Sequence, residues 1–212
     1  MADSDTSFPW AGLIDIGAIT GIALALLYTA GWSYSYHYFQ QFHLGLIGLE
    51  IEREYLLLYG FQVCIARWCL VPLCLLTAFG LPMLFQRYWQ QRPMLRPRLR
   101  AAAQTGGPIS LLLLFIVFYQ LGAWTGHEIF ANEQRSDFPS YPRVKVWLKD
   151  KQDERAAELA KGCYRLLLRG KEQLYLFRAD GVSERLPTEI MANGEVAGVR
   201  LLPLYQTTDE CR

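Results

Sequence analysis

The chain has 212 residues, of which 52% are apolar and 14% aromatic, and its formal net charge at pH 7 is only +1. A charge this close to zero excludes a protein drawn to nucleic acid or acidic lipid by a global field. Apolar residues concentrate before residue 137, and the remainder has the mixed charges of a soluble surface. The composition therefore predicts a membrane part followed by a small soluble domain.

The first apolar segment covers residues 16–36, about the 20 residues that a helix needs to cross a bilayer. Acidic residues, Asp15 among them, precede it, so we expect a retained helix and not a cleaved signal peptide. Gly17, Gly21 and Ala25 form a ridge of small residues, which lets membrane helices approach closely. The ridge is predicted to pack either on the other spans or on a second copy of the chain.

A dense run of aromatic residues lies between Tyr28 and Phe42. Tyrosine and tryptophan gather where a membrane meets water, so the run is predicted to be an interface belt that continues as a helix above the membrane. A lining of a lipid or ligand groove is the alternative. Neither interpretation assigns a reaction.

Two arginines, Arg67 and Arg87, mark the ends of the second apolar segment. They are 20 residues apart, which equals one bilayer crossing at 1.5 Å per residue. The second span is therefore predicted over 67–86, with Arg67 at the outer interface and Gln120 as its hydrogen-bond partner. Residues 46–66 then become an amphipathic segment on the outer surface. Asp15 and Arg67 would border the spans at opposite interfaces.

A third span is predicted over 108–126, beginning at a Gly-Gly-Pro sequence and ending at a glycine. The loop 87–104 before it contains five arginines and no acid: Arg87, Arg92, Arg96, Arg98 and Arg100. Basic loops between spans stay in the cytoplasm. The sequence thus predicts a multi-pass protein of the cell (inner) membrane, with its N-terminus in the cytoplasm and its C-terminal domain outside it.

Residues 137–212 are predicted to form the small α+β extramembrane domain, after the transmembrane region 1–136. Alternating apolar positions and turn residues indicate about four strands and one helix, joined to the membrane part by a stiff linker, 137–142, that contains two prolines. The expected strands are 144–148, 163–169, 173–178 and 199–204, and the expected helix is 150–161. The strands 163–169 and 173–178 are expected to pair as a hairpin. The fold class is therefore three transmembrane helices followed by an α+β domain.

The C-terminal domain contains two cysteines, Cys163 and Cys211. In an oxidising compartment they could form a disulfide, and otherwise they are a core residue and a tail thiol. Three further cysteines in and beside the second span, at spacings of five, fall on different helical faces: Cys64, Cys69 and Cys74. We interpret these three as small buried apolar residues.

The predicted orientation places all three histidines on the outer side, near acidic residues. His37, His43 and His127 together with Glu54 have the ligand chemistry of a divalent-metal site, zinc for example. No His-x-x-x-His spacing supports such a site. Histidines placed at the interface without a metal are the simpler interpretation.

Signatures of phosphate-binding loops, dinucleotide-binding turns and nucleophile elbows are missing from the chain. We therefore expect a non-catalytic integral membrane protein whose extramembrane domain binds a partner or senses a ligand. No cofactor and no nucleic acid is expected. The predicted partners are the lipid bilayer and either a second copy of the chain or another envelope protein. The alternatives are an oligomeric pore or gated effector, and an interfacial metal-dependent enzyme that uses the three histidines.

Overall fold

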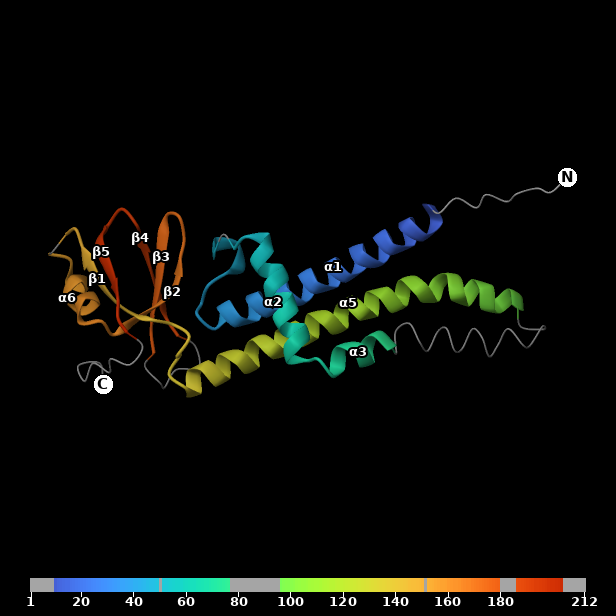
Figure 1. Ribbon diagram of the computed structural model, residues 1–212. Helices are drawn as coiled ribbons and strands as arrows, with labels where there is room; N and C mark the ends of the chain where they lie inside the picture. Colours follow the sequence, from blue (N-terminus) through green and yellow to red (C-terminus); the bar gives the residue numbers. More distant parts are fainter. Residues whose placement is uncertain (1–9, 50, 77–95, 151, 180–185, 204–212) are drawn as a thin grey trace. The chain divides into compact units, whose positions relative to one another are not determined.

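The described part of the chain is helical at first and contains a β-sheet at its end (Figure 1). The computed structural model describes residues 10–49, 51–76, 96–150, 152–179 and 186–203. These residues form five α-helices, a short 3-10 helix and five strands. They confirm the predicted combination of a helical part with an α+β part.

Two compact units are distinguished by their internal contacts. Unit 1 consists of Met1–Tyr34 and Arg53–Thr125, and unit 2 consists of Ser35–Glu52 and Gly126–Arg212. The division falls inside the two longest helices and not at the predicted boundary near residue 137. The ends of both helices are therefore built into the same unit as the sheet.

Helix α1 (Trp10–Gln40) is longer at both ends than the predicted span 16–36. Its continuation past residue 36 follows from burial, because Tyr38 and Phe39 are both 4% exposed in the core of unit 2. The aromatic run is thus not only a surface belt. Its last members are core residues.

Helix α5 (Arg96–Arg135) corrects the predicted third span 108–126. It begins within the predicted basic loop 87–104 and continues through the Gly-Gly-Pro sequence that was expected to start it. It also continues past Gly126, the predicted end. Gly126 and Phe130 are buried, so the last turns of α5 belong to the core of unit 2. Glycine and proline thus mark no helix boundary here.

One helical stretch in the described part of the chain, Ile109–Arg135, is long and apolar enough to cross a membrane. Three spans are not supported. In α1, glycine, threonine, serine and tyrosine residues dilute the apolar character of the second half. Of the predicted span 67–86, the structure describes a turn at 67–69 and helix α3 (Leu70–Leu75), while residues 77–86 lie outside the described residues.

The predicted amphipathic segment 46–66 contains a 3-10 helix (Leu46–Leu49) and helix α2 (Arg53–Ala66). In unit 1, α2 runs across α1 and leads to α3 (Figure 1). Leu56, Gly60 and Val63 of α2 are buried. The opposite side of α2 exposes large apolar side chains: Tyr55, Leu58, Phe61 and Ile65.

Unit 2 contains a five-stranded antiparallel sheet with the strand order β4-β3-β2-β1-β5. The strands are β1 (Arg143–Leu148), β2 (Tyr164–Arg169), β3 (Gln173–Arg178), β4 (Thr188–Ala192) and β5 (Val196–Leu201). The predicted hairpin of β2 and β3 is confirmed by their pairing. The prediction missed β4, whose sequence Thr-Glu-Ile-Met-Ala has little apolar alternation, and began β5 three residues too late.

The sheet curls on itself. Strands β4 and β5 are its two edges, yet only residues 193–195 connect them. A flat five-stranded sheet is about 19 Å wide, whereas this connection reaches roughly 14 Å when extended. The edges must therefore approach each other, and the curled sheet encloses a core of buried side chains: Val144, Val146, Leu148, Leu159, Tyr164, Leu174, Leu176 and Met191.

Helix α6 (Glu154–Lys161), inserted between β1 and β2, confirms the predicted helix and contributes Leu159 to this core. The Asp153 carboxylate caps its first turn by accepting a hydrogen bond from the Arg155 backbone N–H. The side-chain hydrogen bond from Arg155 also lowers the pKa of Asp153. Gly162 ends the helix with φ 86°, a left-handed conformation that glycine adopts without strain. The sheet together with α6 is called the sheet domain below.

Candidate functional site

The connection between α5 and β1 is the most unusual backbone segment in unit 2. Asp137 and Phe138 are consecutive residues with positive φ, 58° and 49°. For a bulky side chain such as phenylalanine this conformation is a strained one. The Phe138 N–H donates to the Glu133 carbonyl oxygen at 2.7 Å, which closes the last turn of α5. The stiffness predicted for this linker from its prolines therefore has a second source.

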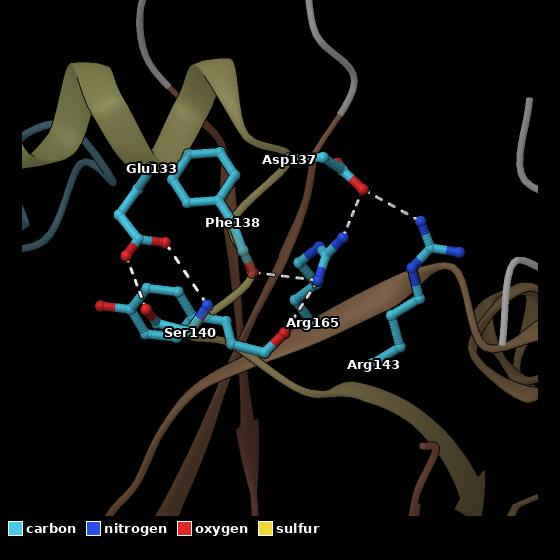
Figure 2. A network of polar contacts seen from close by, with 7 residues as sticks. Glu133, Asp137, Phe138, Ser140, Arg143 and Arg165 are labelled. Atoms are coloured by element: carbon cyan, nitrogen blue, oxygen red, sulfur yellow. Dashed lines mark hydrogen bonds and ion pairs between the residues drawn. The ribbon is translucent and has the colours of Figure 1, made fainter. Parts of the chain in front are cut away.

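A buried arginine of β2 holds this segment in place (Figure 2). Arg165 is 6% exposed. Its Nη1 donates to the carbonyl oxygens of Phe138 (3.1 Å) and Tyr141 (2.8 Å), and its Nη2 donates to Asp137 Oδ2 at 2.5 Å. Arg143 of β1 reaches the same carboxylate oxygen at 3.1 Å. One carboxylate thus serves two guanidinium groups from neighbouring strands.

Burial and the neighbouring charges act in opposite directions on Arg165. Burial lowers the pKa of the Arg165 guanidinium, the Asp137 carboxylate opposes that effect, and Arg143 adds to it. A second contact closes the same segment, because the Ser140 hydroxyl donates to Glu133 Oε1 at 2.6 Å. Every one of these contacts ties the linker to α5 or to the sheet. We call Glu133, Asp137, Ser140, Arg143 and Arg165 the connector network.

An aromatic cluster joins the helix ends to the sheet within unit 2. Its members come from α1 and the loop after it, from α5, from the linker and from β3: Tyr38, Phe42, Phe130, Phe138, Tyr141 and Phe177. Phe42 is fully buried at its centre, 4.9 Å from the ring of Phe177 and 5.3 Å from that of Phe130. Edge-to-face contacts of this kind add to the free energy gained from burial.

Hydrogen bonds reinforce the cluster. The Leu186 N–H donates to the Gln41 carbonyl oxygen at 2.9 Å, and the Thr188 hydroxyl donates to the Phe42 carbonyl oxygen at 2.8 Å. The hydroxyl groups of Tyr38 and Tyr141 are 2.8 Å apart and share a hydrogen bond. The chain that leaves α1 is therefore fixed to the start of β4.

Two of the three histidines meet in unit 2. The rings of His37 on α1 and His127 on α5 are in edge-to-face contact, 5.3 Å between centroids. Gln41 Nε2 lies 3.1 Å from His127 Nδ1 and bridges the two helix ends. Sequence reasoning placed both histidines near one interface but had no signal for their contact, which depends on how the helices pack.

The predicted metal site is not formed by the described residues. No group of three or more histidine, cysteine, aspartate or glutamate side chains among them could hold a metal ion. His43 has an exposed side chain in a turn with φ 57°, and Glu54 lies in the first turn of α2. The four predicted ligands come from separate elements, and only His37 and His127 are brought together.

Arg67 finds other partners than the predicted Gln120, which is exposed. Its Nε donates to Thr125 Oγ1 at 3.3 Å, and its Cζ lies 3.8 Å from the ring centroid of Trp124. A guanidinium over an indole face is a favourable cation–π contact. Asp15, the other predicted charge, lies in α1, and its side chain is outside what the structure describes.

Close helix packing in unit 1 occurs at glycines other than those predicted. A Cβ atom at Gly31 would lie 1.8 Å from the Leu56 carbonyl oxygen, and one at Gly60 would lie 2.0 Å from that of Leu27. By contrast, a Cβ at Gly17 or Gly21 would meet nothing within 4 Å in the described structure.

A third contact involves α5, where a Cβ at Gly122 would lie 2.3 Å from the Ala30 carbonyl oxygen. The predicted ridge of Gly17, Gly21 and Ala25 therefore does not pack within the described chain, and Ala25 is exposed. Its packing against a second copy stays a prediction.

Cys163 is disulfide-bonded. Its predicted partner, Cys211, lies outside the described residues, so the pair itself stays a prediction. Cys64, Cys69 and Cys74 are not in a disulfide, but none of them is buried as expected, since Cys69 is exposed and the other two are half-buried.

Comparisons with family models, with curated proteins and with solved structures find no match for this chain. The functional interpretation therefore rests on the connector network, the aromatic cluster and the surface of the sheet domain.

Proposed function

We propose that the protein is a non-catalytic integral membrane protein whose sheet domain binds a partner or senses a ligand outside the membrane. The observation that carries this proposal is the attachment of the sheet domain to the ends of α1 and α5. Arg165 and the aromatic cluster replace a flexible tether with a packed, hydrogen-bonded connection. A ligand that prefers one arrangement of this connection would shift its equilibrium, which is the physical requirement of a sensor.

Membrane association is supported by the helical stretch Ile109–Arg135 and by the surface of unit 1. Contiguous apolar patches on a protein surface mark contacts with lipid or with other proteins. Large exposed apolar side chains occur on α1, α2 and α5: Ile19, Leu24, Leu58, Phe61, Leu112 and Ile116. We propose that the apolar part of Ile109–Arg135 in α5 spans the membrane and that α1 and the segment after Arg67 contribute further spans, with α2 along the outer interface and Arg67 marking the depth of that interface.

Two observations support the proposed orientation, with the N-terminus in the cytoplasm and the sheet domain outside it. The loop 87–104 is basic and lacks acids, as cytoplasmic loops are. The disulfide at Cys163 belongs to an oxidising compartment. The localisation that follows is the cell (inner) membrane.

The proposed partners are the lipid bilayer and either a second copy of the chain or another envelope protein. Gly17, Gly21 and Ala25 support self-association, since this side of α1 is exposed and closely approachable.

Site-specific photo-crosslinking in intact cells tests the function. A photoreactive residue replaces exposed Ala25 on α1 or exposed Ile190 on β4, and a third variant carries it at buried Leu176 as the control. We expect an adduct of twice the monomer mass from position 25 and a discrete adduct from position 190, but none from position 176. Isolated monomers from both exposed positions would contradict a binding or sensing role.

A further inference from the structure

The outer face of β1 and β5 carries an unusual pair of charges. Val144, Val146 and Leu148 of β1 point into the core. Since successive side chains of a strand alternate between faces, Lys145 and Trp147 lie on the outer face. The strand register places Arg200 of β5 directly opposite Lys145.

Like charges directly opposite each other in an antiparallel pair are destabilising. The ion pairs among the described residues use Arg143, Arg155, Arg165 and Arg178, and none of them includes Lys145 or Arg200. Asp137 compensates the neighbouring pair of arginines, but no acidic residue in the described part of the chain does so for Lys145 and Arg200. An anion between the two side chains would remove their repulsion.

Lys145 is held in position by the end of α6. A Cβ atom at Gly162 would lie 3.0 Å from Lys145 Cγ and 3.1 Å from its Cε, so the glycine makes room for the lysine stem. Because the stem is already held in place, less conformational entropy of the lysine is lost when an anion binds its ammonium group.

Trp147 extends the same face next to the two cations. Its side chain is 43% exposed, and the residue opposite it is Gly198. A Cβ at position 198 would lie 3.7 Å from the indole ring, an ordinary van der Waals contact, so the ring lies next to this glycine. The exposed part of the indole forms a flat apolar surface on this face.

The contacts that fix the sheet domain to the helix ends come from Arg165 of β2, Phe177 of β3 and Thr188 of β4, and β1 contributes Arg143, which contacts Asp137. Among the described residues of this face, Trp147 and Arg200 are exposed and accessible to a ligand, and Lys145 is half-buried beside the end of α6.

We propose that this face binds an anionic glycan, with a sugar ring stacked on Trp147 and its carboxylate or phosphate group between Lys145 and Arg200. The C–H groups of a sugar ring carry partial positive charge and fit the negative face of an indole, and guanidinium groups bind carboxylates through two parallel hydrogen bonds. An acidic peptide would neutralise the two cations. Unlike an acidic glycan, it does not carry a sugar ring beside each acidic group that could stack on Trp147. The assignment rests on the proposed binding function and names its ligand class.

Titration calorimetry on the full chain in uncharged detergent tests the assignment. The probes are oligogalacturonate, a neutral glucose oligomer of the same length, and oligoglutamate. We expect oligogalacturonate to bind at least tenfold more tightly than the other two, with an affinity that falls as salt is raised.

The variants Trp147→Ala and Lys145→Gln/Arg200→Gln should each weaken oligogalacturonate binding at least tenfold. Trp147→Phe, which keeps an aromatic ring, should retain part of the affinity. Lys171→Gln, an exposed lysine in the turn before β3, is the matched control and should bind like the unaltered protein. Circular dichroism of each variant reports whether the sheet is intact.

No binding of oligogalacturonate, equal binding by folded Trp147→Ala, or equal affinity for oligoglutamate would each overturn the glycan assignment. The photo-crosslinking experiment at positions 25 and 190 does not involve these side chains. Adducts there without glycan binding would refute the ligand class alone, whereas the loss of both results would refute the binding function.

Discussion

Arg165 is the one charged side chain that is buried among the described residues. A buried charge is tolerated only when its donors are paired, since desolvation costs several kcal/mol per ion. Its three hydrogen bonds hold the strained backbone at Asp137 and Phe138. The sequence shows Arg165 only as one of several basic residues in strand-like segments. Its importance comes from the carbonyl groups that the linker turns toward it.

We expect Arg165→Leu to lower the local free energy of unfolding in unit 2 by about 3 kcal/mol, because two carbonyl oxygens and a carboxylate lose their donor. Hydrogen exchange followed by mass spectrometry on the full chain measures this as a loss of protection of about a hundredfold in β2 and β3. Arg143→Leu is the control, since Arg143 contacts the same carboxylate from a more exposed position. It should cost less than about 1 kcal/mol. Equal effects of the two substitutions would contradict the role given to Arg165.

The crossings of α1 with α2 and with α5 depend on single glycines. Gly31, Gly60 and Gly122 each face a backbone carbonyl oxygen of another helix, closer than any Cβ atom can approach. Within the described chain the close approaches occur at these three glycines and not at Gly17 or Gly21, whose packing against a second copy stays a prediction. A ridge of small residues indicates that a helix can be approached closely, and only the path of the partner helix decides where this happens.

Gly60→Ala should lower the stability of unit 1 by about 1–3 kcal/mol, because the added methyl group forces α2 away from Leu27. Gly21→Ala, at an open position of α1, should leave stability unchanged or raise it, since alanine is the better helix former by about 1 kcal/mol. Thermal unfolding in detergent, followed by circular dichroism, compares the two. A Gly21→Ala variant as unstable as Gly60→Ala would show that α1 packs through its small-residue ridge instead.

At the scale of the whole molecule, the disulfide and the basic loop together bear on which side of the membrane the sheet domain lies. Cys163 is disulfide-bonded, and Cys211 is its predicted partner. Such a bridge would close a long loop that includes most of the sheet. It would therefore restrict the unfolded chain strongly.

Cys163→Ser and Cys211→Ser are each expected to lower the free energy of unfolding by about 4 kcal/mol according to the loop-entropy relation. The double variant should lose no more than either single one, because one bond is removed in all three. Chemical unfolding of the three proteins, with and without reductant, provides the comparison. A larger loss in the double variant would rule out the pair. The side of the membrane is tested in intact cells with a variant in which Cys64, Cys69 and Cys74 are replaced by serine, so that the thiols of the sheet domain alone can react after reduction. Labelling by a membrane-impermeant reagent would place the domain outside the cytoplasm, and protection from that reagent would place it inside.

The sequence determined which parts of the chain are apolar and which are mixed, because periodicity and composition are local properties. From it followed the helical N-terminal part, the α+β part, the hairpin of β2 and β3, and helix α6, which was predicted over 150–161 and is found at Glu154–Lys161. The curl of the sheet, the extension of α1 and α5 into unit 2, and the contacts of Arg165, Arg67 and His37 were decided by the tertiary structure alone. Each of these depends on residues far apart in the chain, whose approach is set by packing and not by any local pattern. For the same reason only His37 and His127 of the four predicted metal ligands came together, whereas Lys145 and Arg200 came to lie opposite each other.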